Sequence, residues 1–176
     1  HGISVDGTRS PTNSHLEPGN DTIWTTMDER DERGDDLVPE YFTHIEEVRF
    51  YGWPYAYLGP NEDPRRKGER PDLVAKATKP DVLLPAHSSA VGFAFYTGKM
   101  FPKEYQGGAF IALHGSWNRA NRQGYEIAFV PFDKGKPSGP RRDFLTGWML
   151  APDKPEVWGR PVGLLEMPDG SLLISD

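Results

Sequence analysis

The sequence predicts an all-β fold built from short antiparallel strands. From Val91 onward, apolar and β-rich runs recur at intervals of roughly 15 residues, separated by Gly- and Pro-rich turns. The 19 glycines and 17 prolines among 176 residues favour many turns over long helices. Four such strands followed by the start of another pair match the period of a β-propeller blade, and a β-sandwich is the competing all-β architecture.

The first third of the chain alternates between strand candidates and polar loops. Pro54 lies within the aromatic segment 50–57, and because proline cannot donate to a sheet, this segment suits a loop or a sheet edge. The other expected elements are a short strand at 2–5, a polar loop at 8–21, a β-rich strand at 22–27 and a short helical turn at 39–47.

The rest of the chain predicts one long excursion and one complete sheet. Residues 58–80 are polar and Pro-rich, which indicates a long surface excursion. A short apolar run at 82–84 follows, and a turn at 168–171 predicts a hairpin. Four strands are expected to share one sheet, at residues 91–96, 109–114, 125–132 and 142–148.

The stretch from Gly108 to Arg119 combines a buried strand with a loop rich in functional groups. An apolar run bounded by glycines ends at a small-residue corner, and the chain then presents Trp117, Asn118 and Arg119 together. A rigid sheet can hold such a loop against a ligand. The alternative is a core Trp117 and a solvated Arg119. The other tryptophans, Trp53, Trp148 and Trp158, are expected to serve packing.

Residues 28–36 carry six carboxylates and two arginines directly after a strand. The simpler interpretation is a solvated acidic turn. The alternative is a cation-binding loop, because hard cations take carboxylate and backbone carbonyl oxygens. The acidic spacing of an EF-hand loop is absent, so that motif is excluded.

Composition excludes several classes of function. The net charge of −6 and the isoelectric point near 5.4 argue against nucleic acid or an anionic membrane as the main partner. Without cysteine the chain has no disulfide framework, thiolate metal site or cysteine nucleophile. Both ends look cut, since His1 is not a natural start and the chain stops after an apolar strand.

Five separated motifs resemble a known enzyme family. They are 28–31 with 34–41, 50–55, 87–90, 107–119 and 158–164, in that order. Together they resemble the soluble glucose/sorbosone dehydrogenase family, in its sorbosone-dehydrogenase-like branch. The resemblance covers residues from about Trp24 to the end. It implies a six-bladed β-propeller of which this chain is the C-terminal half, about two and a half to three blades.

The resemblance also implies a chemistry. Members bind pyrroloquinoline quinone (PQQ) and calcium and oxidise an aldose or sorbosone, passing hydride from the sugar C1 to the quinone. The family's base histidine lies upstream of His1, which puts activity of this chain alone in doubt. A periplasmic or secreted protein with a sugar substrate and an electron acceptor is implied. The alternative is a non-catalytic propeller segment that serves as a binding or structural module.

The resemblance assigns candidate site residues. Asn118 falls at or beside the position from which better-known members present a lysine to PQQ, and Arg119 offers the charge instead. Arg160 matches the first of two arginines that hold the cofactor, while Val162 replaces the second. The remaining candidates are Trp117 behind Asn118 and Arg119, His87 in a loop near the pocket or merely closing that loop, and Arg30 and Asp31 for calcium.

Half of a propeller exposes strand edges and blade faces that the whole protein buries. We therefore expect the isolated chain to be marginally stable, to self-associate through these edges or to need the missing N-terminal half of the propeller.

Overall fold

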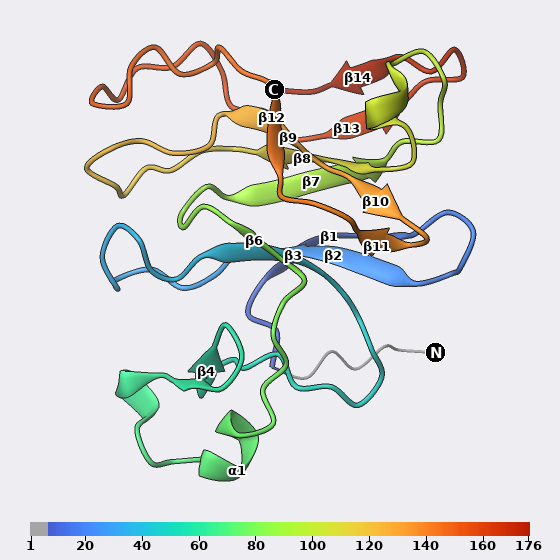
Figure 1. The fold of residues 1–176 in the computed structure, drawn as a ribbon. Helices are drawn as coiled ribbons and strands as arrows, with labels where there is room; N and C mark the ends of the chain where they lie inside the picture. The colour runs from blue at the N-terminus through green and yellow to red at the C-terminus, as the bar shows by residue number, and fades with distance from the viewer. Residues whose placement is uncertain (1–6) are drawn as a thin grey trace.

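Two four-stranded antiparallel sheets form the body of the protein in the computed structural model (Figure 1). The structure describes residues 7–176, so the strand expected at 2–5 lies outside the described residues. The first sheet joins, in order, β1 (Pro11–Leu16), β2 (Ile23–Met27), β3 (Glu40–His44) and β6 (Val82–Leu84). The second joins β7 (Ala90–Phe95), β8 (Ala109–Leu113), β9 (Glu126–Val130) and β12 (Arg142–Leu145).

Three short hairpins and a few helical turns complete the described elements. The hairpins are β4–β5 (Ala56–Tyr57 and Asn61–Glu62), β10–β11 (Phe132–Asp133 and Lys136–Pro137) and β13–β14 (Leu164–Glu166 and Leu172–Ile174). The helical elements are α1 (Pro71–Val74) and two 3₁₀ turns, Pro64–Arg66 and Lys103–Tyr105.

The sheets stack face to face in chain order. Strand β7 packs against β1 and β2, and β13 packs against β7 and β8. Figure 1 shows the β13–β14 hairpin beyond the second sheet, and the segment with β4 and α1 on the far side of the first. Both sheets are meanders whose strands are arranged in chain order, with the β4–β5 hairpin inserted before β6 and the β10–β11 hairpin inserted before β12, as in successive propeller blades. This confirms the predicted all-β fold of a partial β-propeller.

The apolar core lies on both faces of the second sheet. Every residue of β8 is buried, and alternate side chains of a strand point to opposite faces. Ile111 joins a cluster that includes Phe42 of the first sheet, whereas Phe110 joins one that extends to Leu172 of β14. Burial on both faces explains why this strand is a continuous apolar run.

Two expectations for the first sheet were wrong. Residues 8–21 do not form only a loop, because β1 pairs with β2 while most of its side chains stay exposed, so its sequence carries no apolar alternation. Residues 39–47 do not form a helical turn, because β3 lies between β2 and β6, which satisfy its backbone on both edges.

The four strands expected in the second sheet are confirmed, as is the hairpin around 168–171. Strand β12 ends at Leu145 rather than at Trp148. Gly147 follows with a φ of +118°, a conformation that interrupts an extended strand and that favours glycine.

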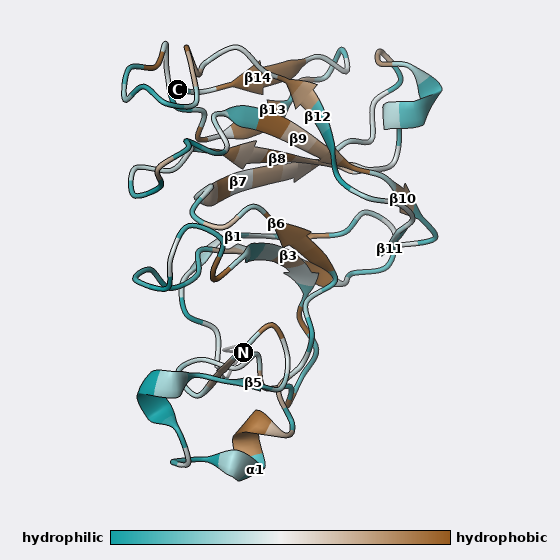
Figure 2. Cartoon of the chain, turned by 60° about the vertical axis from the view of Figure 1, so that its left-hand side comes forward, coloured by the Kyte–Doolittle hydropathy of each residue, from teal (hydrophilic) through white to brown (hydrophobic). Residues whose placement is uncertain are grey.

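The long polar excursion lies mostly at the surface. Residues 64–72 are exposed, whereas Asp63 and Ala77 are buried. Figure 2 shows β6 to β9 in the hydrophobic colour and much of the excursion in the hydrophilic one. Among residues 7–176, no helix has the length and apolar character needed to cross a membrane.

Neighbouring leucines of β6 test how the sheets are held together. Leu84 is 2% exposed in the core between the sheets, and Leu83, on the opposite face, is 50% exposed. We expect Leu84→Ala to lower the unfolding free energy by about 2–5 kcal/mol, because it leaves a cavity. Leu83→Ala should change it by no more than about 0.5 kcal/mol. Urea unfolding measures both, and equal losses would contradict the predicted packing.

Candidate functional site

Loops from both sheets gather at one end of the stack. In an antiparallel meander every second loop emerges at the same end. The loops between β2 and β3, β6 and β7, β8 and β9, and β12 and β13 therefore share one end, on the left of Figure 1. All the sequence-predicted site residues lie on these loops or where they join the strands.

Three of the predicted residues meet at one point on this end. The Asp31 Oδ1 atom lies 2.9 Å from His87 Nδ1 and accepts a hydrogen bond from Asn118 Nδ2 at 2.8 Å. Asp31 belongs to the acidic stretch, His87 to the β6–β7 loop and Asn118 to the β8–β9 loop. One carboxylate thus joins three loops from two sheets. We call Asp31, His87 and Asn118 the site triad.

His87 uses both of its ring nitrogens. Its Nε2 lies 2.9 Å from the carbonyl oxygen of Gly34, which only accepts, so Nε2 donates. Its Nδ1 lies 2.9 Å from Asp31 Oδ1 and 3.3 Å from Asn118 Nδ2. Both ring nitrogens are therefore engaged within the chain, and His87 in this geometry links the three loops.

Asn118 presents a buried acceptor. Its Oδ1 atom is buried and has no hydrogen-bond partner among residues 7–176. An unsatisfied buried polar atom costs about 1–3 kcal/mol, so a donor or cation that reaches it would be bound favourably. The second oxygen of the Asp31 carboxylate lies close by on a side chain that is 42% exposed.

Arg119 is directed toward the acidic loop. It donates to the carbonyl oxygen of Asp35 and pairs with Asp36 at 3.1 Å, while its own side chain is 11% exposed. Arg119 is therefore not a solvated charge, and it fastens the β8–β9 loop to the acidic stretch.

Arg160 approaches the same end from the β12–β13 loop. It donates to the carbonyl oxygen of His114 at 3.2 Å and to that of Gly115, and its guanidinium lies 5.5 Å from the Tyr125 ring. Among residues 7–176, no carboxylate pairs with this guanidinium. Its positive charge is therefore available to an anionic ligand.

The exposed tryptophans correct two expectations. Trp117 is 70% exposed, so it does not fill the space behind Asn118 and Arg119. Trp158 is 78% exposed and does not serve packing within the described residues. Both indoles lie on loops of the site end, where they are open to contact.

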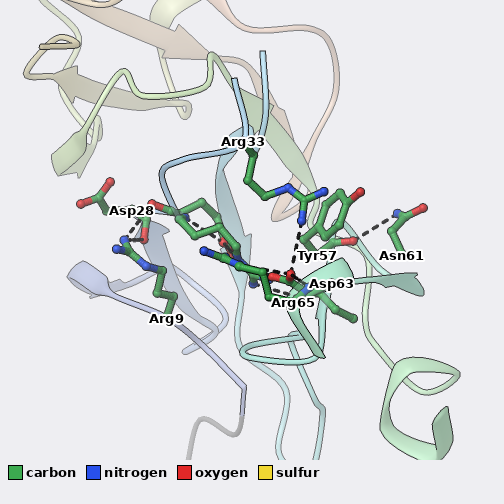
Figure 3. Close-up of polar contacts among 10 residues, drawn as sticks. Arg9, Asp28, Arg33, Tyr57, Asn61, Asp63 and Arg65 are labelled. Carbon is green, nitrogen blue, oxygen red and sulfur yellow. Dashed lines mark hydrogen bonds and ion pairs between the residues drawn. The ribbon is translucent and has the colours of Figure 1, made fainter. Parts of the chain in front are cut away.

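Arg30 faces away from the site triad. Its guanidinium is buried, bonds Asp63 at 2.6 Å and Glu29 at 3.2 Å, and lies 4.7 Å from the Trp53 ring. Figure 3 shows Asp63 at the centre of this network, where it also meets Arg33 and Arg65. Only the backbone carbonyl of Arg30 could bind a cation, because its side chain is itself cationic.

The network shifts the pKa of Asp63. Burial raises this pKa, but the hydrogen bonds from Arg65 and Arg30 outweigh burial and hold it well below its usual range. Within residues 7–176, no group of three or more His, Asp or Glu side chains forms a metal site. The cation-binding interpretation of Arg30 and Asp31 therefore stays a prediction.

One residue of this end has no counterpart among the sequence predictions. Glu40 is buried and accepts hydrogen bonds from the backbone N–H groups of Ser89 and Ala90, directly after His87. A single glutamate ahead of a β-rich run was the only available signal in the sequence.

Comparison with known proteins identifies the family. The TrAA12-like family model matches residues 65–176, and the chain belongs to this family. An uncharacterised protein of Borreliella burgdorferi is 34% identical over 99% of this chain and 46% of its own length. A pyrroloquinoline quinone-dependent pyranose dehydrogenase of Coprinopsis cinerea is 32% identical over 56% of this chain and 15% of its own length.

Solved structures share the fold. A calcium structure of the Trichoderma reesei enzyme of carbohydrate-active enzyme family AA12 covers 97% of this chain with a TM-score of 0.78 and 22% identity. The holo PQQ domain of Coprinopsis cinerea pyranose dehydrogenase also covers 97%, with a TM-score of 0.73 and 22% identity. This chain covers 50% and 52% of those two chains. The chain thus spans about half the length, or less, of the relatives it matches.

The buried pair of Arg30 and Asp63 yields a prediction about stability and pH. Asp63→Asn leaves a buried guanidinium without its closest carboxylate, which should cost about 3–5 kcal/mol at neutral pH. The folded-state pKa of Asp63 is lowered, so its contribution is present above the usual aspartate range and is lost as the pH falls. The deficit of the variant should therefore shrink below about pH 4.

Asp72→Asn is the matched control. Asp72 pairs with Arg70, but its side chain is 55% exposed and the pair is screened by solvent, so its removal should destabilise the protein far less than Asp63→Asn does. Chemical unfolding at several pH values measures both variants. If Asp63→Asn and Asp72→Asn destabilised the protein equally, Asp63 would not be the centre of a buried ion network.

Proposed function

We propose that the end carrying the site triad is part of the PQQ site of a sugar dehydrogenase. The observation that carries the proposal is the meeting of Asp31, His87 and Asn118 beside a buried acceptor that has no partner. The TrAA12-like family and the printed names of the Coprinopsis cinerea proteins support PQQ-linked sugar oxidation in general.

The charges of this end suit an anionic quinone. PQQ carries three carboxylates, so its site needs cationic and N–H donors. Within residues 7–176 the Arg160 guanidinium contacts carbonyl oxygens and the Tyr125 ring but no carboxylate, so its charge is available to the ligand. Asn118 offers an amide at the centre, and the exposed indole of Trp117 offers an aromatic face. Arg119 holds the acidic stretch in place. Its positive charge becomes available to the ligand if the guanidinium releases the Asp36 carboxylate.

We assign to the residues of this chain the binding and orientation of the cofactor. We assign the proton transfer to residues outside this chain. When bound, PQQ supplies the hydride acceptor and calcium supplies a Lewis acid. Asp31, through its exposed carboxylate, and the backbone carbonyl of Arg30 are the ligands that we assign to calcium. Because His87 has no free nitrogen, we place the base in a part of the propeller outside this chain.

The narrower features rest on the sequence resemblance. We propose an aldose or sorbosone as substrate, in a sorbosone-dehydrogenase-like enzyme, with a separate electron acceptor. A periplasmic or secreted location agrees with PQQ enzymes of this type. We also propose that the remaining blades, or a second copy of the chain, cover the exposed blade edges of this half.

A second candidate function is favoured by the contacts of His87. Both ring nitrogens of the triad histidine are engaged within residues 7–176, and a site built in this way would bind a ligand without turning it over. In that case the protein would be a non-catalytic propeller that binds PQQ or another anion. Binding of PQQ without oxidation of any aldose by the complete protein would select this alternative.

A PQQ titration tests the proposed function. The protein is produced from the complete reading frame that encodes this chain, and PQQ is added to the apoprotein in calcium. Arg160→Ala and Arg119→Ala should each weaken binding by about 1.5–3 kcal/mol, the range for a hydrogen bond to a charged group.

Arg66→Ala is the control, because Arg66 lies in the exposed excursion and pairs with Glu69. It should leave the PQQ affinity unchanged. The assignment fails if neither site variant weakens binding, or if Arg66→Ala weakens it as much.

A further inference from the structure

A buried carboxylate lies directly beneath the loop that carries His87. Glu40, the first residue of β3, is 1% exposed. Its Oε1 accepts the backbone N–H of Ser89 at 2.7 Å, and its Oε2 accepts that of Ala90 at 2.6 Å. Both carboxylate oxygens are therefore used to hold the β6–β7 loop, which lies next to β3 in space and about fifty residues away in sequence.

The loop needs such support because its backbone is strained. His87 has a φ of +65° and Ser89 a φ of +54°, values that residues other than glycine seldom adopt. Each such residue costs about 1–3 kcal/mol and persists only where its surroundings hold it. Consecutive N–H groups in this conformation form a concavity that binds acceptor oxygens, and the Glu40 carboxyl group supplies them from within the chain.

The same loop passes this support on to the rest of the site. The carbonyl oxygen of Ser89 accepts the N–H of His114 at 2.9 Å, and that of Ser88 accepts the N–H of Gly115 at 2.7 Å. The carbonyl oxygens of His114 and Gly115 in turn accept from Arg160. A continuous chain of hydrogen bonds thus runs from Glu40 through the β6–β7 loop to Arg160.

The next blade contains a comparison residue. Glu126 is the first residue of β9, which occupies the same place in its sheet as β3 does. It is also buried, at 7% exposed, but it pairs with Arg141 at 2.9 Å. A buried glutamate at this position of a blade therefore does not by itself hold a site loop, and the contacts of Glu40 are particular to the His87 loop.

Two opposing effects act on the pKa of Glu40. Burial, and then the neighbouring Asp28, raise this pKa to about 8, while the hydrogen bonds from the Ala90 and Ser89 N–H groups lower it. Replacement by glutamine keeps the volume of the side chain but replaces one acceptor oxygen with an amide that cannot accept an N–H.

We propose that Glu40 is a positioning residue of the site, which acts by holding the β6–β7 loop in the conformation that places His87 in the site triad. The part of this inference that concerns PQQ rests on the proposed function. The part that concerns the loop does not.

Amide hydrogen exchange of the apoprotein tests the loop directly. In Glu40→Gln, the Ser89 and Ala90 amides should lose protection by about tenfold or more, the equivalent of one lost hydrogen bond to a charged group. Glu126→Gln, the matched control, should leave these two amides unchanged even if it lowers the melting temperature equally. Unchanged protection in Glu40→Gln, or equal losses in both variants, would overturn the proposal.

PQQ titration of the same variants tests the consequence for the ligand. Glu40→Gln should raise the Kd for PQQ about tenfold, and Glu126→Gln should not. In a cycle with His87→Ala, the loss of PQQ affinity in the double variant should be smaller than the sum of the two single losses, because Glu40 and His87 act through the same loop. Additive losses would overturn the positioning role. If the unchanged protein did not bind PQQ at all, the proposed function would fail, and the exchange experiment would still decide the role of Glu40 in the loop.

Discussion

The burial of β8 and β9 on both faces is the constraint on which the rest of the structure depends. All five residues of each strand are buried, so each strand needs an apolar partner on either side. The first sheet covers one face and the β13–β14 hairpin the other. Stacked in this way, antiparallel meanders bring every second loop to a common end. The site is thus a consequence of how the sheets are packed, since no single segment contains it.

Polar contacts then close this end of the stack. Asp31 and His87 are 56 positions apart in the chain, and Asp31 and Asn118 are 87 apart, yet all three share one carboxylate oxygen. Glu40 adds a second connection, because it accepts a hydrogen bond from the backbone of the β6–β7 loop. Arg119 adds a third, because it pairs with Asp36 of the acidic stretch. Each connection joins different strands, so the loops can only be ordered once the sheets have packed. This arrangement gives a rigid support for groups that meet a ligand.

The sequence predicts the second sheet well because β7, β8 and β9 are short apolar strands separated by turns rich in glycine and proline. It fails for β1, whose side chains are mostly exposed and therefore polar, and for β3, whose strand conformation depends on its two neighbours. His87, Asn118 and Asp31 were identified from motifs, but their meeting could not be, because it depends on how loops far apart in sequence are stacked. Glu40 was missed for the same reason, since its partners are backbone groups of a distant loop.

Two residues, Trp158 and Arg30, lie in surroundings that differ from those expected from the sequence. The indole of Trp158 was expected to be buried because tryptophan usually is, but its loop lies at the open end of the stack. Arg30 was expected in a loop whose carbonyl oxygens bind calcium, and its side chain had no expected partner. The excursion folds back and supplies Asp63 to the Arg30 guanidinium from 33 positions away. The charged stretch 28–36 therefore serves two roles. The Arg30 side chain is buried in the ion network around Asp63, whereas the Asp31 carboxylate is part of the site triad.

The proposed function requires that the loops of this end form one ligand face for an anionic quinone. A crystal structure of the protein made from the complete reading frame, grown with PQQ and calcium, tests this requirement. We expect PQQ to lie against the end that carries the site triad, with its polar atoms in hydrogen-bonding contact with Asn118 and Arg160. PQQ bound elsewhere, with no contact to residues 28–36, 85–89 or 114–119, would contradict the claim.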